Sequence, residues 1–132
     1  MAIEIDHLGI AVRSLSDGLA FYRDVLGMTV AQRETVASEH VNVAMLPSGG
    51  ESRIELLEPT DDESTIARFL ARHGPGLHHI AVKVDDLTQT VESLRQRGAR
   101  LLNEPRPGAG GHIYVFVHPE STGGVLLELI QK

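Results

Sequence analysis

The chain contains an internal repeat, and this repeat limits the folds that it can adopt. Residues 7–15 match residues 79–87 at an offset of 72, with a His, the alternating apolar residues and a final Leu in equivalent places. Farther along, residues 54–57 match residues 127–130 at an offset of 73. Each half has about 60 to 65 residues, which is too few to bury a core comfortably alone. We therefore expect the two halves to pack side by side in one domain over residues 1–132.

Both halves show the same order of predicted elements: a strand, a helix and three further strands. Alternating apolar residues predict the strands, helical spacing predicts the helices, and residues rich in Gly and Pro separate them. The expected fold class is α+β, with two βαβββ modules in tandem forming a curved eight-stranded mixed sheet around a cavity. The first repeat covers about 3–59, a linker helix about 60–74 and the second repeat about 76–131; the strands are predicted at 3–12, 28–36, 40–46, 52–58, 77–84, 99–103, 112–118 and 124–130, the other helices at 15–26 and 87–97, and a loop at 104–111.

Composition and charge exclude several classes of function. A formal charge of −6 and only two Tyr, three Phe and no Trp leave neither a basic stripe nor stacking platforms for nucleic acid. The apolar runs are far shorter than the roughly 20 residues that cross a bilayer. Residues 1–6 carry acids instead of the basic start of a secretory signal, so we expect a cytoplasmic protein. Because the chain has no Cys, any metal must bind to His and carboxylates.

The first strand of each repeat separates two kinds of side chain. Leu8, Ile10 and Val12 share one face of the strand, whereas His7 lies on the other face with small residues. The second copy repeats the pattern around His79. Since the large apolar face must meet the helices, we expect both His side chains to line the cavity.

A Glu recurs in the last strand of each repeat. Glu55 lies within Arg-Ile-Glu-Leu-Leu, and Glu128 lies within Val-Leu-Leu-Glu-Leu-Ile. A carboxylate in such a position is costly to bury unless it is paired or bound to a cation. Together with His7 and His79, the two Glu side chains are therefore predicted to form a divalent-metal site with positions left open for substrate oxygens.

Simpler interpretations exist for each of these residues. Glu55 could form an ion pair with Arg53, and Glu128 could reach water from an edge strand. His78 points to the opposite face from His79, so we assign it a structural role. We expect the remaining histidines at strand ends or on the surface: His40, His73, His112 and His118.

Several longer sequence strings, spread over nearly the whole chain, are similar to those of a known family. In these strings the chain resembles the methylmalonyl-CoA epimerase family of the vicinal oxygen chelate superfamily. The FYRDVLG string and the first His are common across the superfamily, whereas IELLEP, HHIA and STGGVLLEL are more specific to the epimerase family. The strings are DHLGIAV (6–12), FYRDVLG (21–27), IELLEP (54–59), GLHHIA (76–81), RPGAGG (106–111), HP (118–119) and STGGVLLEL (121–129).

The resemblance implies a metal-dependent epimerase that interconverts the 2R and 2S forms of methylmalonyl-CoA by 1,1-proton transfer through a metal-stabilised enolate. It implies an acyl-CoA substrate, a homodimer and a divalent cofactor, with cobalt, manganese, nickel, magnesium and zinc all left open. The implied metal ligands are His7, Glu55, His79 and Glu128.

Inversion at the carbon requires an acid and a base on opposite faces. The resemblance implies Glu39 and Glu128 as this pair, with Glu34 as the alternative to Glu39. A shift of one residue in the comparison would put Ser38 in the place of the acid.

Two other classes of function are compatible with the same architecture. One is a different metalloenzyme, such as a glyoxalase-like isomerase or a dioxygenase. A dioxygenase normally needs two His and one carboxylate on iron, so Glu55 argues against it. The other is a metal-free small-molecule-binding resistance protein, which would not need the four ligand-type residues.

Overall fold

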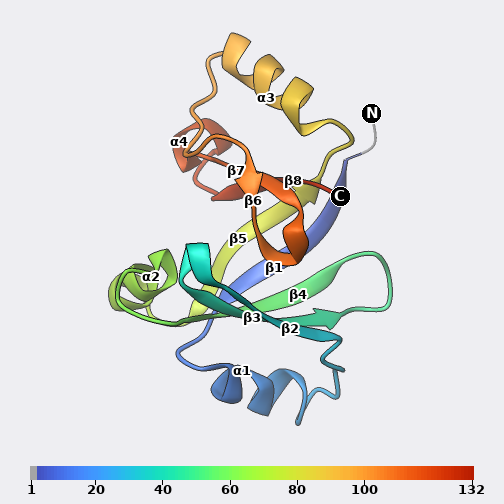
Figure 1. The fold of residues 1–132 in the computed structure, drawn as a ribbon. Coiled ribbons are helices and arrows are strands. Elements are labelled where there is room, and N and C mark those ends of the chain that lie inside the picture. The colour runs from blue at the N-terminus through green and yellow to red at the C-terminus, as the bar shows by residue number, and fades with distance from the viewer. Residues whose placement is uncertain (1–2) are drawn as a thin grey trace. The chain divides into compact units, whose positions relative to one another are not determined.

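The computed structural model describes residues 3–132, and it has the α+β architecture predicted from the sequence. Within these residues there are eight β-strands and four α-helices (Figure 1). The chain divides into two compact units. The first unit is residues 7–78, and the second unit is the residues up to Asp6 together with residues 79–132. Each unit contains one of the two predicted βαβββ modules.

The first unit contains a sheet with the strand order β2-β3-β4-β1. β3 runs antiparallel to both of its neighbours, and β1 runs parallel to β4. A 3-10 turn, Ala37–Glu39, joins β2 to β3. The elements are β1 (Glu4–Ala11), α1 (Leu15–Tyr22), β2 (Gln32–Val36), β3 (Val41–Pro47), β4 (Arg53–Pro59) and α2 (Thr65–His73).

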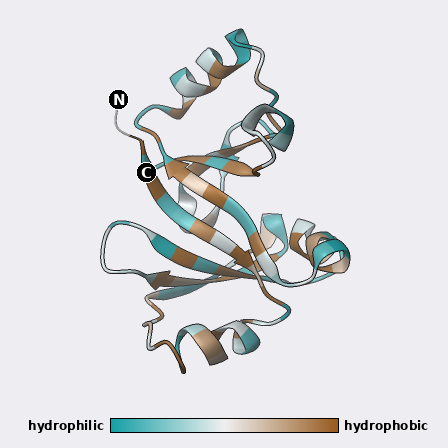
Figure 2. Ribbon diagram, turned by 180° about the vertical axis from the view of Figure 1, so that it is seen from behind, coloured by the Kyte–Doolittle hydropathy of each residue, from teal (hydrophilic) through white to brown (hydrophobic). Residues whose placement is uncertain are grey.

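The core of the first unit lies between this sheet and α1, which contacts β3 and β4 (Figure 1). Hydrophobic and hydrophilic residues alternate along the strands, as Figure 2 shows. Ile10 and Val12 belong to this core, which confirms the predicted orientation of the first strand. The buried members of the core are Val12, Leu15, Leu19, Ala44, Leu46 and Leu56.

The second unit contains a sheet with the strand order β5-β8-β7-β6. β5 and β8 are parallel, and the other pairs are antiparallel. Its core, which includes Val84, Leu87 and Val91, packs the sheet against α3. The elements are β5 (Gly76–Lys83), α3 (Leu87–Gln96), β6 (Arg106–Pro107), β7 (Ile113–Val117), α4 (Pro119–Thr122) and β8 (Leu127–Gln131).

In each module, a side chain from the last strand caps the first helix by accepting a backbone hydrogen bond. Oε1 of Glu58, near the end of β4, accepts a hydrogen bond of 2.9 Å from the backbone N–H of Leu15. Oε1 of Gln131, at the end of β8, accepts one of 2.7 Å from the backbone N–H of Leu87. These N–H groups are among those that a helix leaves without internal partners. The end of each module's last strand therefore fixes the start of its first helix.

Some predicted boundaries were wrong. The helix predicted at 15–26 ends at Tyr22, because the backbone N–H of Leu26 bonds to Phe21 O, five residues back, instead of following the α-helical pattern. The chain then turns at Gly27, whose φ of 87° suits a residue without a Cβ.

The second predicted strand of the second repeat is also misplaced. Within residues 99–103, Leu101 makes one isolated bridge to Val117, and no strand forms. The short strand β6 lies instead inside the segment predicted as a loop. α4 was not predicted; it starts where His118 accepts a hydrogen bond from the N–H of Glu120 and Pro119 occupies the first helical position.

None of the helices formed by residues 3–132 combines the length and the apolar character needed to cross a membrane.

Candidate metal-binding and catalytic site

In the first unit, His7 and Glu55 lie side by side on neighbouring strands. His7 Nδ1 is 3.3 Å from Glu55 Oε2, and both side chains are about 4% exposed. Glu55 is paired across the sheet with Gly9, so the strand register places its side chain one step from that of His7. Both residues occupy the face of the sheet opposite to α1, as the alternation of the strands requires. The sequence prediction that these two side chains share a face is met.

Arg53 provides the cation for this buried pair. Its Nε donates a hydrogen bond of 2.8 Å to Glu55 Oε2, and it lies two residues before Glu55 on the same face of β4. The ion pair considered from the sequence as the simpler role of Glu55 is therefore present. Both of these contacts reach Oε2, which leaves Oε1 as the oxygen that a cation would approach.

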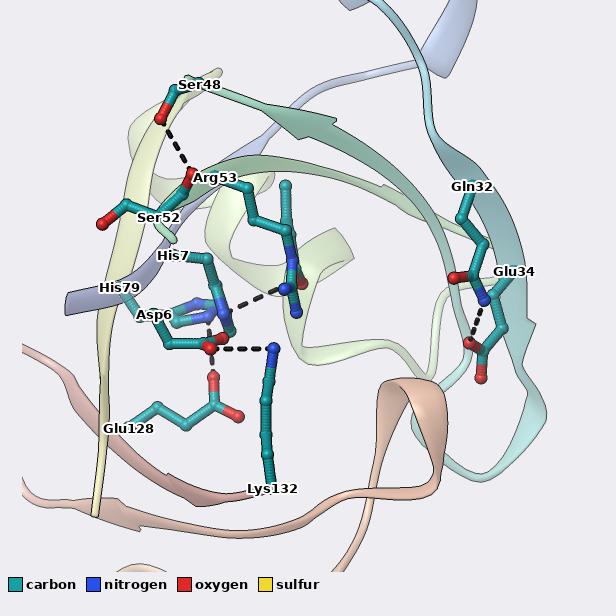
Figure 3. A network of polar contacts seen from close by, with 11 residues as sticks. Asp6, His7, Gln32, Glu34, Ser48, Ser52, Arg53, His79, Glu128 and Lys132 are labelled. Carbon is teal, nitrogen blue, oxygen red and sulfur yellow. Dashed lines mark hydrogen bonds and ion pairs between the residues drawn. The ribbon is translucent and has the colours of Figure 1, made fainter. Parts of the chain in front are cut away.

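In the second unit, His79 and Glu128 form the equivalent pair. His79 Nε2 is 3.0 Å from Glu128 Oε1, and their side chains are 6% and 10% exposed (Figure 3). Ala81 pairs with Glu128 in the register of β5 and β8. The ring of Phe116 packs edge-on against His79 at 5.4 Å between centroids, which restricts the orientation of the imidazole. Each module thus holds one buried imidazole beside one buried carboxylate.

The buried Asp6 forms a further ion pair with Lys132 in the second unit, which the sequence did not predict. Lys132 Nζ is 2.8 Å from Asp6 Oδ1, and the Asp6 side chain is 4% exposed (Figure 3). The sequence did contain a sign that Asp6 would be paired. Asp6 directly precedes His7 on a predicted strand, and a buried acid needs a partner. Nothing in the sequence pattern identified Lys132 as that partner.

Glu39 and Glu34 are the two candidates for the second acid–base group. Glu39 is the last residue of the 3-10 turn between β2 and β3, and Glu34 lies in the middle of β2. Both residues are half-buried. Ser38, in the same turn as Glu39, is exposed.

The other histidines lie away from these two pairs in the strand register or act in local structure. His78 packs edge-on against Phe69 at 5.0 Å, which agrees with a structural role. His73 packs on the same Phe69 ring at 4.8 Å. His118 caps α4 through its Nδ1. The His112 ring lies near Gly110 in the 3-10 turn Ala109–Gly111.

His40 belongs to an exposed cluster at the start of β3. Its Nδ1 is 2.9 Å from Asp61 Oδ2, and its Nε2 is 3.7 Å from Glu63 Oε2. The hydrogen bond to Asp61, followed by nearby acidic charge, raises the pKa of His40 above its ordinary value of 6.5. The same bond lowers the pKa of Asp61 below 3.8.

The chemistry of the two buried pairs suits a divalent cation. Neutral imidazole nitrogen and carboxylate oxygen are ligands that zinc, manganese, cobalt and nickel accept, and carboxylate oxygen also suits magnesium. Burial strengthens such sites because it excludes competing water. Each pair could contribute two ligands.

Comparison with known proteins places this chain among proteins of one family. Residues 6–116 match the Glyoxalase/Bleomycin resistance protein/Dioxygenase superfamily. The uncharacterized protein YqjC of Bacillus subtilis is 40% identical over 128 residues, which cover 96% of this chain and 91% of that protein.

Two further relatives carry the name predicted from the sequence strings. The human mitochondrial methylmalonyl-CoA epimerase is 36% identical over 129 residues, which cover 96% of this chain and 73% of that protein. The structure of a Streptomyces coelicolor methylmalonyl-CoA epimerase variant in complex with 2-nitronate-propionyl-CoA matches with a TM-score of 0.91 at 39% identity. That match covers 97% of this chain and 96% of the other. The resemblance predicted from the sequence is confirmed.

Proposed function

The chain belongs to the Glyoxalase/Bleomycin resistance protein/Dioxygenase superfamily, and from this membership we propose that it is a methylmalonyl-CoA epimerase. The observation that carries the proposal is the buried His–Glu pair at equivalent positions of both modules, His7 with Glu55 and His79 with Glu128. Relatives of the same name at 36% and 39% identity over nearly the whole chain support it.

We propose that one divalent cation binds to His7, Glu55, His79 and Glu128. The donor set fits such an ion, because it offers two imidazole nitrogens and carboxylate oxygens from buried side chains. When bound, the cation would supply positive charge to the thioester oxygen as negative charge develops there. Arg53, held against Glu55, would fix the orientation of that carboxylate toward the ion.

The reaction itself needs two acid–base groups. The C2 proton of the substrate is acidic because it lies between a thioester and a carboxylate. Inversion requires one group to remove it and another to return a proton to the opposite face. We propose Glu128 as one group. The other is Glu39, in the turn between β2 and β3, or its alternative Glu34 on β2.

The test is proton exchange in heavy water. The purified protein, supplied with cobalt or manganese, should convert 2S-methylmalonyl-CoA to the 2R form and introduce deuterium at C2. The expected gain over the uncatalysed reaction follows from general acid–base catalysis, which contributes roughly 10²- to 10⁴-fold, and from charge stabilisation in addition. Glu128→Gln should abolish the conversion. A wild-type protein that leaves the substrate at the uncatalysed rate would remove the epimerase proposal.

The predicted homodimer belongs to this proposal as well. Size-exclusion chromatography with light scattering should give twice the chain mass of 14.3 kDa.

A further inference from the structure

We propose that Phe116 on β7 limits the size of the alkyl group that the substrate can carry at C2. This inference rests on the proposed epimerase function and names a residue that determines its substrate specificity. It follows from the second unit alone, where the strand register places the Phe116 ring beside Glu128, the side chain proposed to exchange a proton with C2.

Phe116 and Glu128 are direct neighbours on the paired strands β7 and β8. The backbone groups of Phe116 point away from β8. Its N–H donates a hydrogen bond of 2.8 Å to Asn103 Oδ1, and its carbonyl oxygen accepts one of 2.8 Å from the N–H of Leu102. Phe116 and Glu128 therefore form a non-hydrogen-bonded pair, in which the Cα atoms are about 4.5 Å apart and the side chains are closer than in the other kind of pair.

The alternation of β7 determines the face on which the Phe116 ring lies. Val115 and Val117, its neighbours along the strand, belong to the core that packs against α3. The Phe116 ring therefore lies on the opposite face. That face also carries the buried pair of the second unit, because Glu128 is the cross-strand partner of Phe116 and the ring of His79 packs against it.

The two strands beside Glu128 present side chains of very different size. Its partner on β5 is Ala81, which is fully buried, and its partner on β7 is Phe116. The methyl group of Ala81 leaves space next to the carboxylate, whereas the Phe116 ring fills the space on the other side. A substituent on the carbon that exchanges a proton with Glu128 is therefore limited in size on the β7 side.

The Phe116 ring is held in place from two sides. It packs edge-on against His79 at 5.4 Å between centroids and against Tyr114 at 5.5 Å, and both of these neighbours are buried. Phe116 itself is half-buried, so part of its ring is available to contact a bound molecule. A ring that is fixed in this way accommodates a methyl group and rejects a longer alkyl group by steric overlap.

The test compares two substrates that differ by one methylene. The wild-type protein, supplied with cobalt or manganese, should use methylmalonyl-CoA with a kcat/KM about 10- to 200-fold above that for ethylmalonyl-CoA, the usual effect of one methylene in an apolar pocket. Phe116→Leu, which replaces the ring by a smaller side chain, should reduce this ratio by about tenfold or more. Phe21→Leu is the matched control, since it makes the same replacement at a Phe of α1 that is 52% exposed, and it should keep the wild-type ratio.

The ratio distinguishes a limit on size from a structural effect. If Phe116 only orients His79, its replacement lowers kcat/KM for both substrates by the same factor, and an unchanged ratio overturns the proposal. A wild-type protein that uses both substrates equally well overturns it too.

Thermal denaturation shows whether the variants fold. If Phe116→Leu does not fold, Phe116→Met serves instead, because its flexible side chain fills the space but can move aside, and it should also reduce the ratio. A wild-type protein that is inactive with both substrates would instead remove the proposed function.

Discussion

At the scale of single residues, each buried carboxylate of the candidate site has its own partner. Glu55 contacts Arg53 and His7, Glu128 contacts His79, and Asp6 contacts Lys132. A buried carboxylate without a partner would carry a large desolvation cost. These pairs therefore keep the side chains in place before any cation arrives, and a cation that binds gains from ligands that are already oriented.

The exposed pair of His40 and Asp61 makes stability depend on pH. The pKa of His40 is raised, so its contribution is fully present below about 6.5, the value in an unfolded chain, and is lost as the pH rises through the folded-state value. The pKa of Asp61 is lowered, so its contribution is present above about 3.9 and is lost as the pH falls through the folded-state value. The pair contributes most between these limits.

We therefore expect Asp61→Asn to lower the urea midpoint of unfolding more at about pH 5.5 than at about pH 8.5, because the contribution of the raised His40 pKa is lost as the pH rises. The Asn oxygen can still accept the backbone N–H of Glu63, as Oδ1 of Asp61 does, so the turn is preserved. Arg95→Gln, which removes an exposed ion pair with Glu104, serves as the control and should show little change between these pH values. An equal effect of Asp61→Asn at both pH values contradicts the prediction.

At the scale of elements, the repeat preserves a link from the last strand of each module to its first helix. In the first unit the link is charged, and Glu58 also accepts a hydrogen bond of 2.8 Å from the Asn42 amide. In the second unit the link is the neutral Gln131. A carboxylate near a helix N-terminus also gains from the helix dipole, by about 0.3 to 1 kcal/mol.

Removing this link should destabilise the first unit. Glu58→Ala leaves the Leu15 N–H and the Asn42 amide without their acceptor, at a cost of about 1 to 3 kcal/mol in the free energy of unfolding. Glu58→Gln should cost less, because the amide oxygen can accept from Leu15 as Gln131 does from Leu87. Urea denaturation measures both, and Gln131→Ala provides the matched change in the second unit. A Glu58→Ala variant as stable as the wild type would show that the link contributes nothing.

The sequence was sufficient to predict the elements that depend on local pattern. Alternation identified the face of β1 that carries His7, because this property depends only on counting residues along one strand. The end of α1 and the position of β6 were not predictable in this way. α1 ends where a backbone N–H bonds to a carbonyl five residues back instead of four, and β6 exists because Arg106 pairs with Tyr114 of β7.

The same distinction applies to the candidate site. The His–Glu pairs could be predicted from the repeat. The position of Glu34, by contrast, depends on which residue of β3 it pairs with. That register is set by the turn between β2 and β3, where His40 adopts a φ of 54° that a sequence pattern does not reveal. Lys132 was missed for a related reason, since its contact with Asp6 joins residues at the two ends of the chain.

At the scale of the whole molecule, the two His–Glu pairs could bind two cations separately or one cation together, and the number of bound cations distinguishes these cases. If each His–Glu pair bound its own ion, the chain would take up two ions and each module would bind independently. If the four side chains serve one ion, as proposed, the chain should bind one equivalent, and the loss of a ligand from either module should weaken the same binding event.

We therefore expect one equivalent of cobalt or manganese per chain in isothermal titration calorimetry. A saturating cation at about 100 times its dissociation constant should stabilise the wild type by about 2.7 kcal/mol. Glu55→Gln and Glu128→Gln, which change one ligand in each module without changing its size, should each remove most of this stabilisation. Lys83→Gln, which breaks an exposed ion pair with Glu4, should leave it intact. Two equivalents in the wild type, with one retained in either Glu variant, would mean that the modules bind separate ions. Each Glu would then be a ligand only of the ion in its own module.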